Sequence, residues 1–269
     1  MKRLERWAGQ NGLEIVQIAT PGSAERQLAQ AGVLEPGDLV VALGGDGTVL
    51  SALHASAPVG SPVLGVACGS VGALAAVTGD ALAEALDRVL AGDWTARRLP
   101  ALSIEMPNGD RDWAVNDFVG VRRGAGQLVA SLTVDDELYA RMAGDGVIVA
   151  TALGSSAYSM AAGGPLLAAG TPAFVCTPLA MHGGNAPPLV VPATSTLHVQ
   201  LLPGFAGFDI EIDGHNHPAR DLDYAITLND AKVTLISLHD RTSLGLTGLR
   251  EKRLITDSAR VLARDARGS

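Results

Sequence analysis

The sequence predicts an α/β protein made of an N-terminal parallel-sheet α/β domain and a C-terminal β-rich, sandwich-like domain. Before about residue 95, short apolar runs alternate with helical segments, which is the pattern of a parallel sheet covered by helices. After it, short β-rich segments are separated by turn residues such as Asn108-Gly109. We therefore expect an α/β domain over 1–97, a β-rich domain over 98–240 and a tail over 241–269 that packs back on the first domain.

The first half supplies alternating helices and strands. Apolar runs predict strands at 13–19, 39–43 and 62–67, and helical periodicity predicts helices at 3–10, 23–31, from 49 onward, and 81–90. The second half supplies short strands, predicted at 102–106, 113–121, 128–135, 147–151, 188–192, 196–202, 208–212 and 232–238. A ligand cleft is expected between the two halves.

The composition excludes several classes of protein. The chain has 269 residues, 47% of them hydrophobic, and a mean hydropathy of +0.24, which is ample for a core. No apolar stretch approaches the roughly 18 residues of a membrane helix, and the charged N-terminus lacks the apolar block of a secretory signal. The net charge of −8 argues against nucleic-acid binding, which requires a basic face. We expect a cytoplasmic protein with no membrane or nucleic-acid partner.

The strand at 39–43 leads directly into a turn of three glycines, one carboxylate and one hydroxyl, Gly44-Gly45-Asp46-Gly47-Thr48. Glycines allow a ligand to approach the backbone closely, and N–H groups at a following helix start bind phosphate well. A carboxylate is poorly placed there for simple anion binding. Asp46 is therefore expected to hold Mg²⁺ or to take a proton from an attacking hydroxyl, with a helix N-cap as the structural alternative.

Two further glycine-rich blocks follow strands. Cys68-Gly69-Ser70-Val71-Gly72 comes after the strand at 62–67, so it is expected at the same carboxyl-end edge of the sheet as Asp46. In the second half, a strand feeds a turn with Thr151, Ser155 and Ser156, followed by a small-residue helix running to Gly163-Gly164. Its hydroxyls suit ribose or phosphate oxygens and Tyr158 offers a flat face for a base, while helix capping and close packing explain the same composition.

Isolated reactive side chains are assigned structural or surface roles. Cys68 and Cys176 are far apart in apolar segments and are expected to be buried, reduced thiols. His54 is expected to be a structural or solvated helix-face residue, and His182 to lie in a loop at the cleft. Solvated surface positions are the default for the arginine pairs at 97–98 and 122–123.

These motifs together resemble the NAD kinase family. The resemblance spans roughly residues 38–250 and follows, in order, the glycine-rich turn at 44–48, Asn116-Asp117, the block from Asp145-Gly146 to Gly163-Gly164-Pro165, the proline-rich 187–192 and Asp213-Gly214. The turn at 44–48 alone is shared with lipid kinases and 6-phosphofructokinases, and its combination with the second block is the specific signal. The resemblance implies transfer of the ATP γ-phosphate to the adenosine ribose 2′-hydroxyl of NAD, with Mg²⁺ or another divalent cation, in a homodimer or homotetramer.

The resemblance also implies roles for single residues. Asp46 would orient or deprotonate the 2′-hydroxyl. The phosphates would lie about Gly44, Gly45, Gly47 and Thr48. The dinucleotide would be bound by Asn116, Asp117, Asp145, Ser156, Ala157 and Tyr158, with His215 facing it as well. No metal-ligating residue is carried over.

The sequence departs from the family pattern at several positions. Asp117 stands in place of a glutamate, Leu153 in place of a threonine, Ala67 in place of an asparagine and Ala73 in place of a phenylalanine. The segment before Gly44 has room for about one strand–helix unit, where the family commonly has more. Two alternatives therefore stay open: a kinase of the same superfamily acting on another hydroxyl, and a catalytically weak nucleotide-binding protein.

Overall fold

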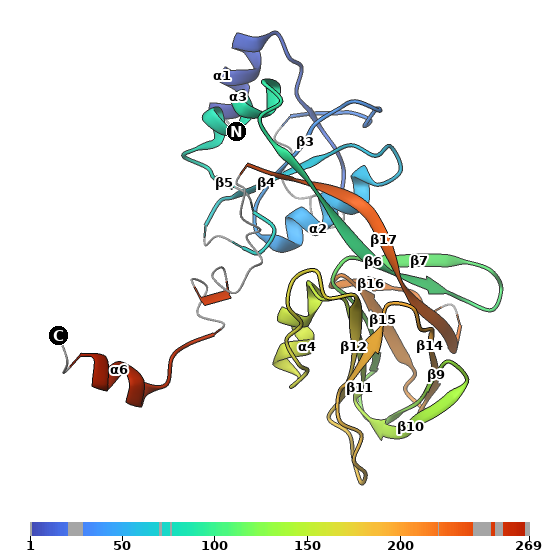
Figure 1. Ribbon diagram of the computed structural model, residues 1–269. Coiled ribbons are helices and arrows are strands. Elements are labelled where there is room, and N and C mark those ends of the chain that lie inside the picture. The colour runs from blue at the N-terminus through green and yellow to red at the C-terminus, as the bar shows by residue number, and fades with distance from the viewer. Residues whose placement is uncertain are drawn as a thin grey trace.

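The structure, a computed structural model, describes residues 2–20, 29–69, 72–75, 77–219, 221–238, 249–250 and 255–266. The chain folds into an N-terminal α/β part and a C-terminal β-sandwich, which two long strands connect (Figure 1). The predicted fold class is confirmed. Among the described residues, no helix combines the length and apolarity that crossing a bilayer requires.

The N-terminal part is built on a small parallel sheet. Strand β4 pairs in parallel with β3 on one side and with β5 on the other. Helix α2 covers one face of this sheet, and α1 and α3 cover the opposite face (Figure 1). Its elements are α1 (Lys2–Asn11), β1 (Val16–Gln17), β2 (Gln30–Ala31), β3 (Val40–Leu43), α2 (Asp46–Ser56), β4 (Val63–Ala67), β5 (Val77–Thr78) and α3 (Leu82–Leu90).

Alternation along β4 explains why both faces of the sheet are covered. All five residues of β4 are buried, and successive side chains of a strand point to opposite faces. Val63 packs in the cluster under α2 with Leu53, whereas Leu64 and Val66 pack with Trp7 of α1 on the other side. The continuous apolar run in the sequence is therefore the signature of a strand buried on both faces.

The C-terminal part is a sandwich of two antiparallel layers. One layer has the strand order β13-β12-β11-β8-β15-β16, and the other contains β10, β9, β14 and the start of β17 (Asp223–Ser237). Buried side chains from both layers, including Phe118, Phe174, Leu132 and Val199, form one core. The strands are β7 (Arg111–Ala114), β8 (Asp117–Arg122), β9 (Leu128–Val134), β10 (Glu137–Gly144), β11 (Gly146–Ala150), β12 (Ala173–Leu179), β13 (Leu189–Pro192), β14 (Leu197–Pro203), β15 (Phe208–Ile212) and β16 (His215–His217).

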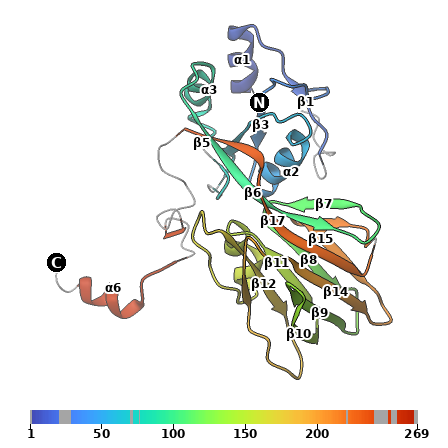
Figure 2. The same cartoon turned by 45° about the vertical axis from the view of Figure 1, so that its right-hand side comes forward.

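Two long strands run through both parts. β6 (Thr95–Glu105) pairs antiparallel with β17 (Asp223–Ser237), with an irregularity between Asn229 and Val233. The first half of β17 pairs with β14 of the sandwich, and its end pairs in parallel with β4. One nine-stranded sheet therefore continues from the sandwich into the α/β part (Figure 2).

Several predicted elements differ from the observed ones. The strand expected at 13–19 is reduced to β1, and residues 30–31, expected at the end of a helix, form β2 beside it; residues 21–28 lie outside the described residues. Helix α2 begins at Asp46 and not at residue 49, because Gly45, whose backbone is extended, is its N-cap. The predicted helix reaching residue 163 is only a 3-10 turn at Gly154–Ser156 and α4 (Tyr158–Ala161). Cys176 is buried as expected, but Cys68 is exposed.

The C-terminal tail is described only in part. Helix α6 (Ala259–Asp265) lies apart from the sheets in both views (Figures 1 and 2). Within the described part of the tail, Leu249 is buried, with 5% of its surface exposed. Because residues 239–248 and 251–254 lie outside the described residues, packing of this tail on the N-terminal part stays a prediction.

Candidate active site

Asp46 lies at the meeting point of the two glycine-rich turns. It is the first residue of α2, and its carboxylate accepts hydrogen bonds from the backbone N–H of Ala73 at 2.7 Å and of Leu74 at 2.9 Å. The structural alternative of an Asp46 N-cap is therefore wrong: Gly45 occupies the cap position. The expectation that both turns share one edge of the sheet is confirmed by these two bonds.

Two glycines are required by close contacts at this point. A Cβ on Gly72 would lie 1.9 Å from Oδ1 of Asp46, and a Cβ on Gly44 would lie 2.3 Å from Oγ1 of Thr48. By contrast, a Cβ on Gly45 or Gly47 would meet nothing within 4 Å. Gly72 and Gly44 thus allow the turn to close on itself, while Gly45 and Gly47 leave its outer side open to a ligand.

The segment Asn116-Asp117, where the chain enters β8 after β7, is fixed by the carboxylate of Asp213. This buried carboxylate accepts hydrogen bonds from the backbone N–H groups of Val115 (2.8 Å), Asn116 (2.6 Å) and Asp117 (3.1 Å). Asp213 itself has a φ of +51°, a left-handed conformation that aspartate tolerates better than most residues. Three donors on one carboxylate hold the loop in a single conformation.

The turn after β11 holds the same segment from its other side. The Thr151 hydroxyl donates to the carbonyl of Val115 at 2.6 Å, and the Thr151 N–H donates to the carbonyl of Asn116 at 2.9 Å. A Cβ on Gly154 would lie 2.0 Å from the Asn116 carbonyl oxygen, so only glycine permits this approach. Both the carbonyl and the N–H groups of the segment are therefore engaged by the protein.

The side chains of Asn116 and Asp117 have polar atoms that remain available to a ligand. Oδ1 of Asn116 is buried and is the one such side-chain atom without a hydrogen-bond partner among the described residues. Asp117 is 5% exposed, and burial, with smaller effects from the charges of Asp213 and Glu211, raises its pKa to about 7. An unpaired amide oxygen beside a carboxyl suits the hydroxyl or amino groups of a ligand.

Helix α2 reaches the 213–215 turn through two side chains. Nε2 of His54 lies 2.7 Å from Oδ2 of Asp213, and the His54 ring stacks on Trp113 with ring centroids 4.0 Å apart. Oγ of Ser51 lies 3.1 Å from Nε2 of His215. His54, expected to be structural or solvated, is structural, and it joins the two parts of the chain.

The predicted residues Ser156, Ala157 and Tyr158 lie in the 3-10 turn at Gly154–Ser156 and at the start of α4. Ser156 donates to the carbonyl of Leu153, Ala157 follows it, and Tyr158 at the start of α4 is 44% exposed. Partial burial and, to a smaller extent, the charges of Glu211, Asp145 and Asp117 raise the pKa of Tyr158. The side chain of Leu153 packs against the apolar cluster between the two parts.

Asp145 lies at the other end of β11 from the Asn116 segment. The five residues of β11 separate it from Thr151, so the two residues are about 20 Å apart in extended chain. Its Oδ1 accepts a hydrogen bond from Nε of Arg122 at 2.5 Å, which lowers the pKa of Asp145. Arg122, like Arg123 with Asp209, is therefore paired and not a free surface cation. Within one chain, the structure does not bring Asp145 together with Asp46 and Asn116.

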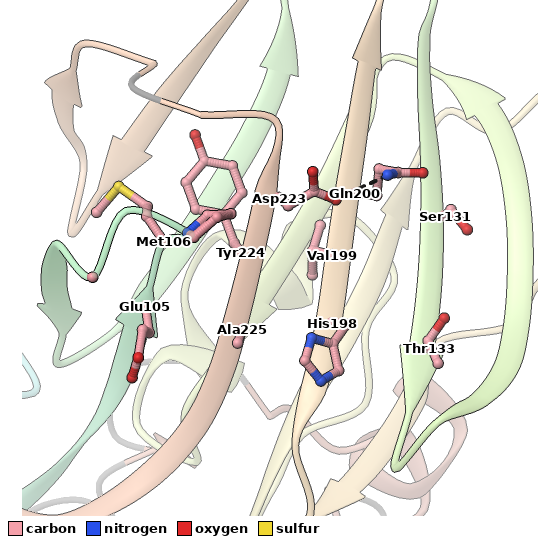
Figure 3. A pocket seen from close by; sticks show the side chains of 12 residues that line it. Glu105, Met106, Ser131, Thr133, His198, Val199, Gln200, Asp223, Tyr224 and Ala225 are labelled. Atoms are coloured by element: carbon pink, nitrogen blue, oxygen red, sulfur yellow. Dashed lines mark hydrogen bonds between the residues drawn. The ribbon is translucent and has the colours of Figure 1, made fainter.

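A separate hollow of about 450 Å³ lies on the sandwich and contains none of the predicted site residues. Glu105, Thr133, His198 and Asp223 are among the side chains that line it, on neighbouring strands β6, β9, β14 and β17 (Figure 3). Among the described residues, no group of three or more His, Cys, Asp or Glu side chains could hold a metal ion.

Sequence reasoning missed two of the residues that organise the site. In the sequence, Asp213 stands out only as part of an Asp-Gly turn, and Thr151 only as a hydroxyl for a ligand. An Asp-Gly pair between two short strands did signal a tight turn. Nothing in the sequence indicates that the carboxylate of Asp213 reaches back to residues 115–117.

Two solved structures with the same architecture are an NAD kinase and an NADH kinase. An NAD kinase from Archaeoglobus fulgidus in complex with ATP aligns with a TM-score of 0.72, covering 95% of both chains at 23% identity. Yeast NADH kinase complexed with NADH aligns with a TM-score of 0.69 at 24% identity, covering 82% of this chain and 67% of that one. At these identities the likeness defines the fold.

The sequence comparisons then define the family. The ATP-NAD kinase N-terminal domain matches residues 2–94, and the ATP-NAD kinase C-terminal domain matches residues 116–231. The NAD kinase of Koribacter versatilis is 34% identical over 221 residues, which cover 78% of this chain and 77% of that relative. The NAD kinase of Clostridium perfringens is 37% identical over 182 residues, 66% of each chain. The chain belongs to the ATP-NAD kinase family.

Proposed function

We propose that the protein transfers the γ-phosphate of ATP to the 2′-hydroxyl of the adenosine ribose of NAD, giving NADP and ADP. The observation that carries this proposal is Asp46, fixed by two backbone N–H groups in the open glycine-rich turn of a chain whose two parts both match the ATP-NAD kinase family. Phosphoryl transfer depends mainly on positioning and charge neutralisation, and this turn supports both.

The phosphates are proposed to lie along the open side of the turn. The first N–H groups of α2, those of Asp46 and Gly47, precede the hydrogen bonds of the helix itself and carry the positive end of its dipole. Gly45 and Gly47 leave space there, and Thr48 is exposed beside them. Because Gly44 has no side chain, Thr48 can lie close to it within the turn.

The acceptor hydroxyl is proposed to lie against the Asp46 carboxylate. Each carboxylate oxygen uses one lone pair for the N–H of Ala73 or Leu74 and keeps another for the hydroxyl proton. The 2′-oxygen forms a bond to the γ-phosphorus, the bond to the β-phosphate oxygen breaks, and Asp46 orients the hydroxyl or takes its proton. Asn116 and Asp117 hold the dinucleotide through their unused polar atoms, with Ser156, Ala157, Tyr158 and His215 around it.

Mg²⁺ is proposed to enter as part of the MgATP substrate. Among the described residues, no group of three or more His, Cys, Asp or Glu side chains could hold a resident ion. When bound, the ion neutralises charge on the phosphates. The chain contributes the backbone N–H groups and the orientation of the acceptor.

The test is NADP formation by purified protein with ATP, Mg²⁺ and NAD, compared with Asp46→Asn. The amide keeps the shape but loses the charge and one of the two acceptor oxygens, so we expect a loss of about 100-fold or more in kcat. Because one of the N–H groups of Ala73 and Leu74 loses its acceptor, the thermal midpoint should fall while the protein still folds. Equal activity in the variant would contradict the role of Asp46. A folded wild-type protein without NADP formation would contradict the proposed acceptor.

A kinase acting on another hydroxyl is the second candidate, and the observation that favours it is Asp117. Aspartate is one methylene shorter than the glutamate of the family, and its carboxyl is buried. ADP release that requires a different hydroxyl compound, without NADP, would support this candidate. The Asp117→Glu variant separates the two, because the longer side chain should improve the KM for NAD only if NAD is the acceptor.

A homodimer or homotetramer and a cytoplasmic location stay predictions. Exposed Leu138, Val190 and Phe205 supply apolar surface on the sandwich that assembly could cover. Analytical ultracentrifugation of the full chain would distinguish a monomer from either assembly.

A further inference from the structure

The contact between His54 and Asp213 joins two halves of the site that are far apart in the sequence. His54 stands eight residues after Asp46 on α2, and Asp213 is the carboxylate that holds the N–H groups of residues 115–117. The side chain of Asp213 is fully buried, whereas that of His54 is 29% exposed. The link between α2 and the Asn116 segment is therefore a polar contact at the edge of the core.

The hydrogen-bonding rules fix the direction of this contact. An ionised carboxylate can only accept, so Nε2 of His54 carries the proton and donates it to Asp213. Stacking on Trp113 keeps the imidazole in the orientation that this bond requires. The helix is thus tied to a carboxylate that already has three backbone donors.

A second side chain of α2, that of Ser51, lies about one turn before His54 and contacts the same 213–215 turn. The Ser51 hydroxyl donates to the carbonyl of Gly47 at 3.0 Å, so its oxygen accepts from Nε2 of His215 at 3.1 Å. Residues three apart lie on one face of a helix. Ser51 and His54 therefore hold the 213–215 turn at two points, and Ser51 also binds the carbonyl of Gly47 in the glycine-rich turn itself.

We propose that His54 is a positioning residue, which sets where Asp46 lies relative to Asn116 and Asp117 through its bond to Asp213. This inference deepens the proposed function and rests on it for its kinetic consequence. Asp46 belongs to the half-site for the phosphates, and Asn116-Asp117 to the half-site for the dinucleotide. His54 itself lies about 12 Å along the helix from Asp46, so it acts through the helix and the loop.

The experiment compares His54→Phe with His54→Gln. Phenylalanine keeps an aromatic ring on Trp113 but cannot donate to Asp213, whereas the amide nitrogen of glutamine can take the place of Nε2. His198→Phe is the matched control, because His198 is exposed on β14 in the separate hollow (Figure 3). Each protein is assayed for kcat, for the KM of ATP and of NAD, and for its thermal midpoint.

We expect His54→Phe to lower kcat by about tenfold or more while the KM of ATP stays within about twofold, since the half-site for the phosphates keeps its own contacts and loses its alignment with the Asn116 segment. His54→Gln should recover most of this kcat, and His198→Phe should match the wild type. An unchanged kcat in His54→Phe, or a loss that His54→Gln does not restore, would overturn the proposal.

A measurement that requires no catalytic turnover tests this proposal independently of the proposed function. Amide hydrogen exchange of residues 115–117 should be faster by about tenfold in His54→Phe than in the wild type, with exchange in β11 unchanged, because one support of their acceptor is gone. Unchanged exchange at these amides would overturn the positioning role. If the wild type forms no NADP, the proposed function fails, and this measurement still decides the role of His54.

Discussion

At the scale of single residues, the position of Asp46 depends on a side chain that is missing. The carboxylate occupies the space that a Cβ on Gly72 would fill, and it accepts from the next two N–H groups, those of Ala73 and Leu74. The substitution of Ala73 for the phenylalanine of the family leaves this backbone contact intact, because only the N–H of residue 73 is used. Gly72 therefore belongs to the site because it has no side chain, which leaves room for the Asp46 carboxylate.

Gly72→Ala should remove most of the activity without unfolding the protein. The new methyl group would displace the Asp46 carboxylate, and we expect kcat to fall by about 100-fold, as is typical when a reacting group is misplaced by about 1 Å. Gly69→Ala in the same turn is the control, since its Cβ would meet nothing within 4 Å. Activity in Gly72→Ala equal to that of Gly69→Ala would show that the carboxylate does not need this position.

The buried carboxyl of Asp117 makes stability depend on pH. Its pKa is raised to about 7 from 3.8, so between about pH 4 and pH 7 the folded chain binds a proton that the unfolded chain has released. The free energy of unfolding therefore falls as pH rises through this interval and stays low above it. The full shift corresponds to at most about 4 kcal/mol.

Asp117→Asn should flatten this pH dependence. The neutral amide has no charge to bury, so we expect the difference in free energy of unfolding between pH 5 and pH 8 to shrink by about 1–3 kcal/mol. Urea unfolding at both pH values measures it, with Asp230→Asn at an exposed position as the control. An identical slope in Asp117→Asn and wild type would mean that Asp117 is ionised throughout.

At the scale of elements, residues at the ends of strands form the site, and residues in the middle of strands form the core. β11 is buried along its whole length, and Thr151 directly after it turns its hydroxyl to the carbonyl of Val115 and accepts from the N–H of Gly154. The hydroxyl thus satisfies two backbone groups that would otherwise be buried without partners. This turn binds the carbonyl groups of Val115 and Asn116, whereas Asp213 binds the N–H groups of the same segment.

Thr151→Val should destabilise the protein by about 1–3 kcal/mol, because an isosteric methyl group leaves both backbone groups unsatisfied. Thr171→Val is the matched control: its hydroxyl donates to the carbonyl of Ala168 in a more exposed turn, where water replaces the bond. Thermal or urea unfolding compares the two variants. Equal effects would show that burial of the Thr151 contact is unimportant.

Elements with a strong local signal were predictable, and those defined by distant pairing were not. The apolar runs of β3 and β4 and the amphipathic helix α3 have the expected places. β10 and β12 were missed. The two-residue strand β2 lies where the end of a helix was expected, because so short a strand is defined by its pairing with β1. Fold class follows from periodicity, whereas pairing follows from tertiary contacts.

The same distinction holds for the site. Asp46 could be singled out because a carboxylate among glycines is conspicuous in the sequence. The link from His54 to Asp213, and from Asp213 to the Asn116 segment, spans 159 and 97 residues and has no local pattern. Leu153, which departs from the family, packs between the two parts of the chain and so supplies apolar contact there.

At the scale of the whole molecule, the two parts share a sheet and a buried apolar cluster. β6 and β17 continue through both, and one buried cluster combines Val49 and Leu53 of α2 with Val115 of the loop and Leu235 of β17. The apolar cluster and the His54–Asp213 bond lie at the same junction. Loss of either part would expose the cluster of the other, which couples their stabilities.

We therefore expect one cooperative unfolding transition for the described parts. Tryptophan fluorescence reports the α/β part and the junction, where Trp7, Trp94 and Trp113 lie, and far-UV circular dichroism reports the sandwich as well. Leu235→Ala at the junction should lower the free energy of unfolding by about 2–5 kcal/mol and shift both urea midpoints together. Val190→Ala, at an exposed position of β13, should leave both unchanged. Two separate transitions, or a shift confined to fluorescence, would show that the sandwich folds independently of the part that holds Asp46.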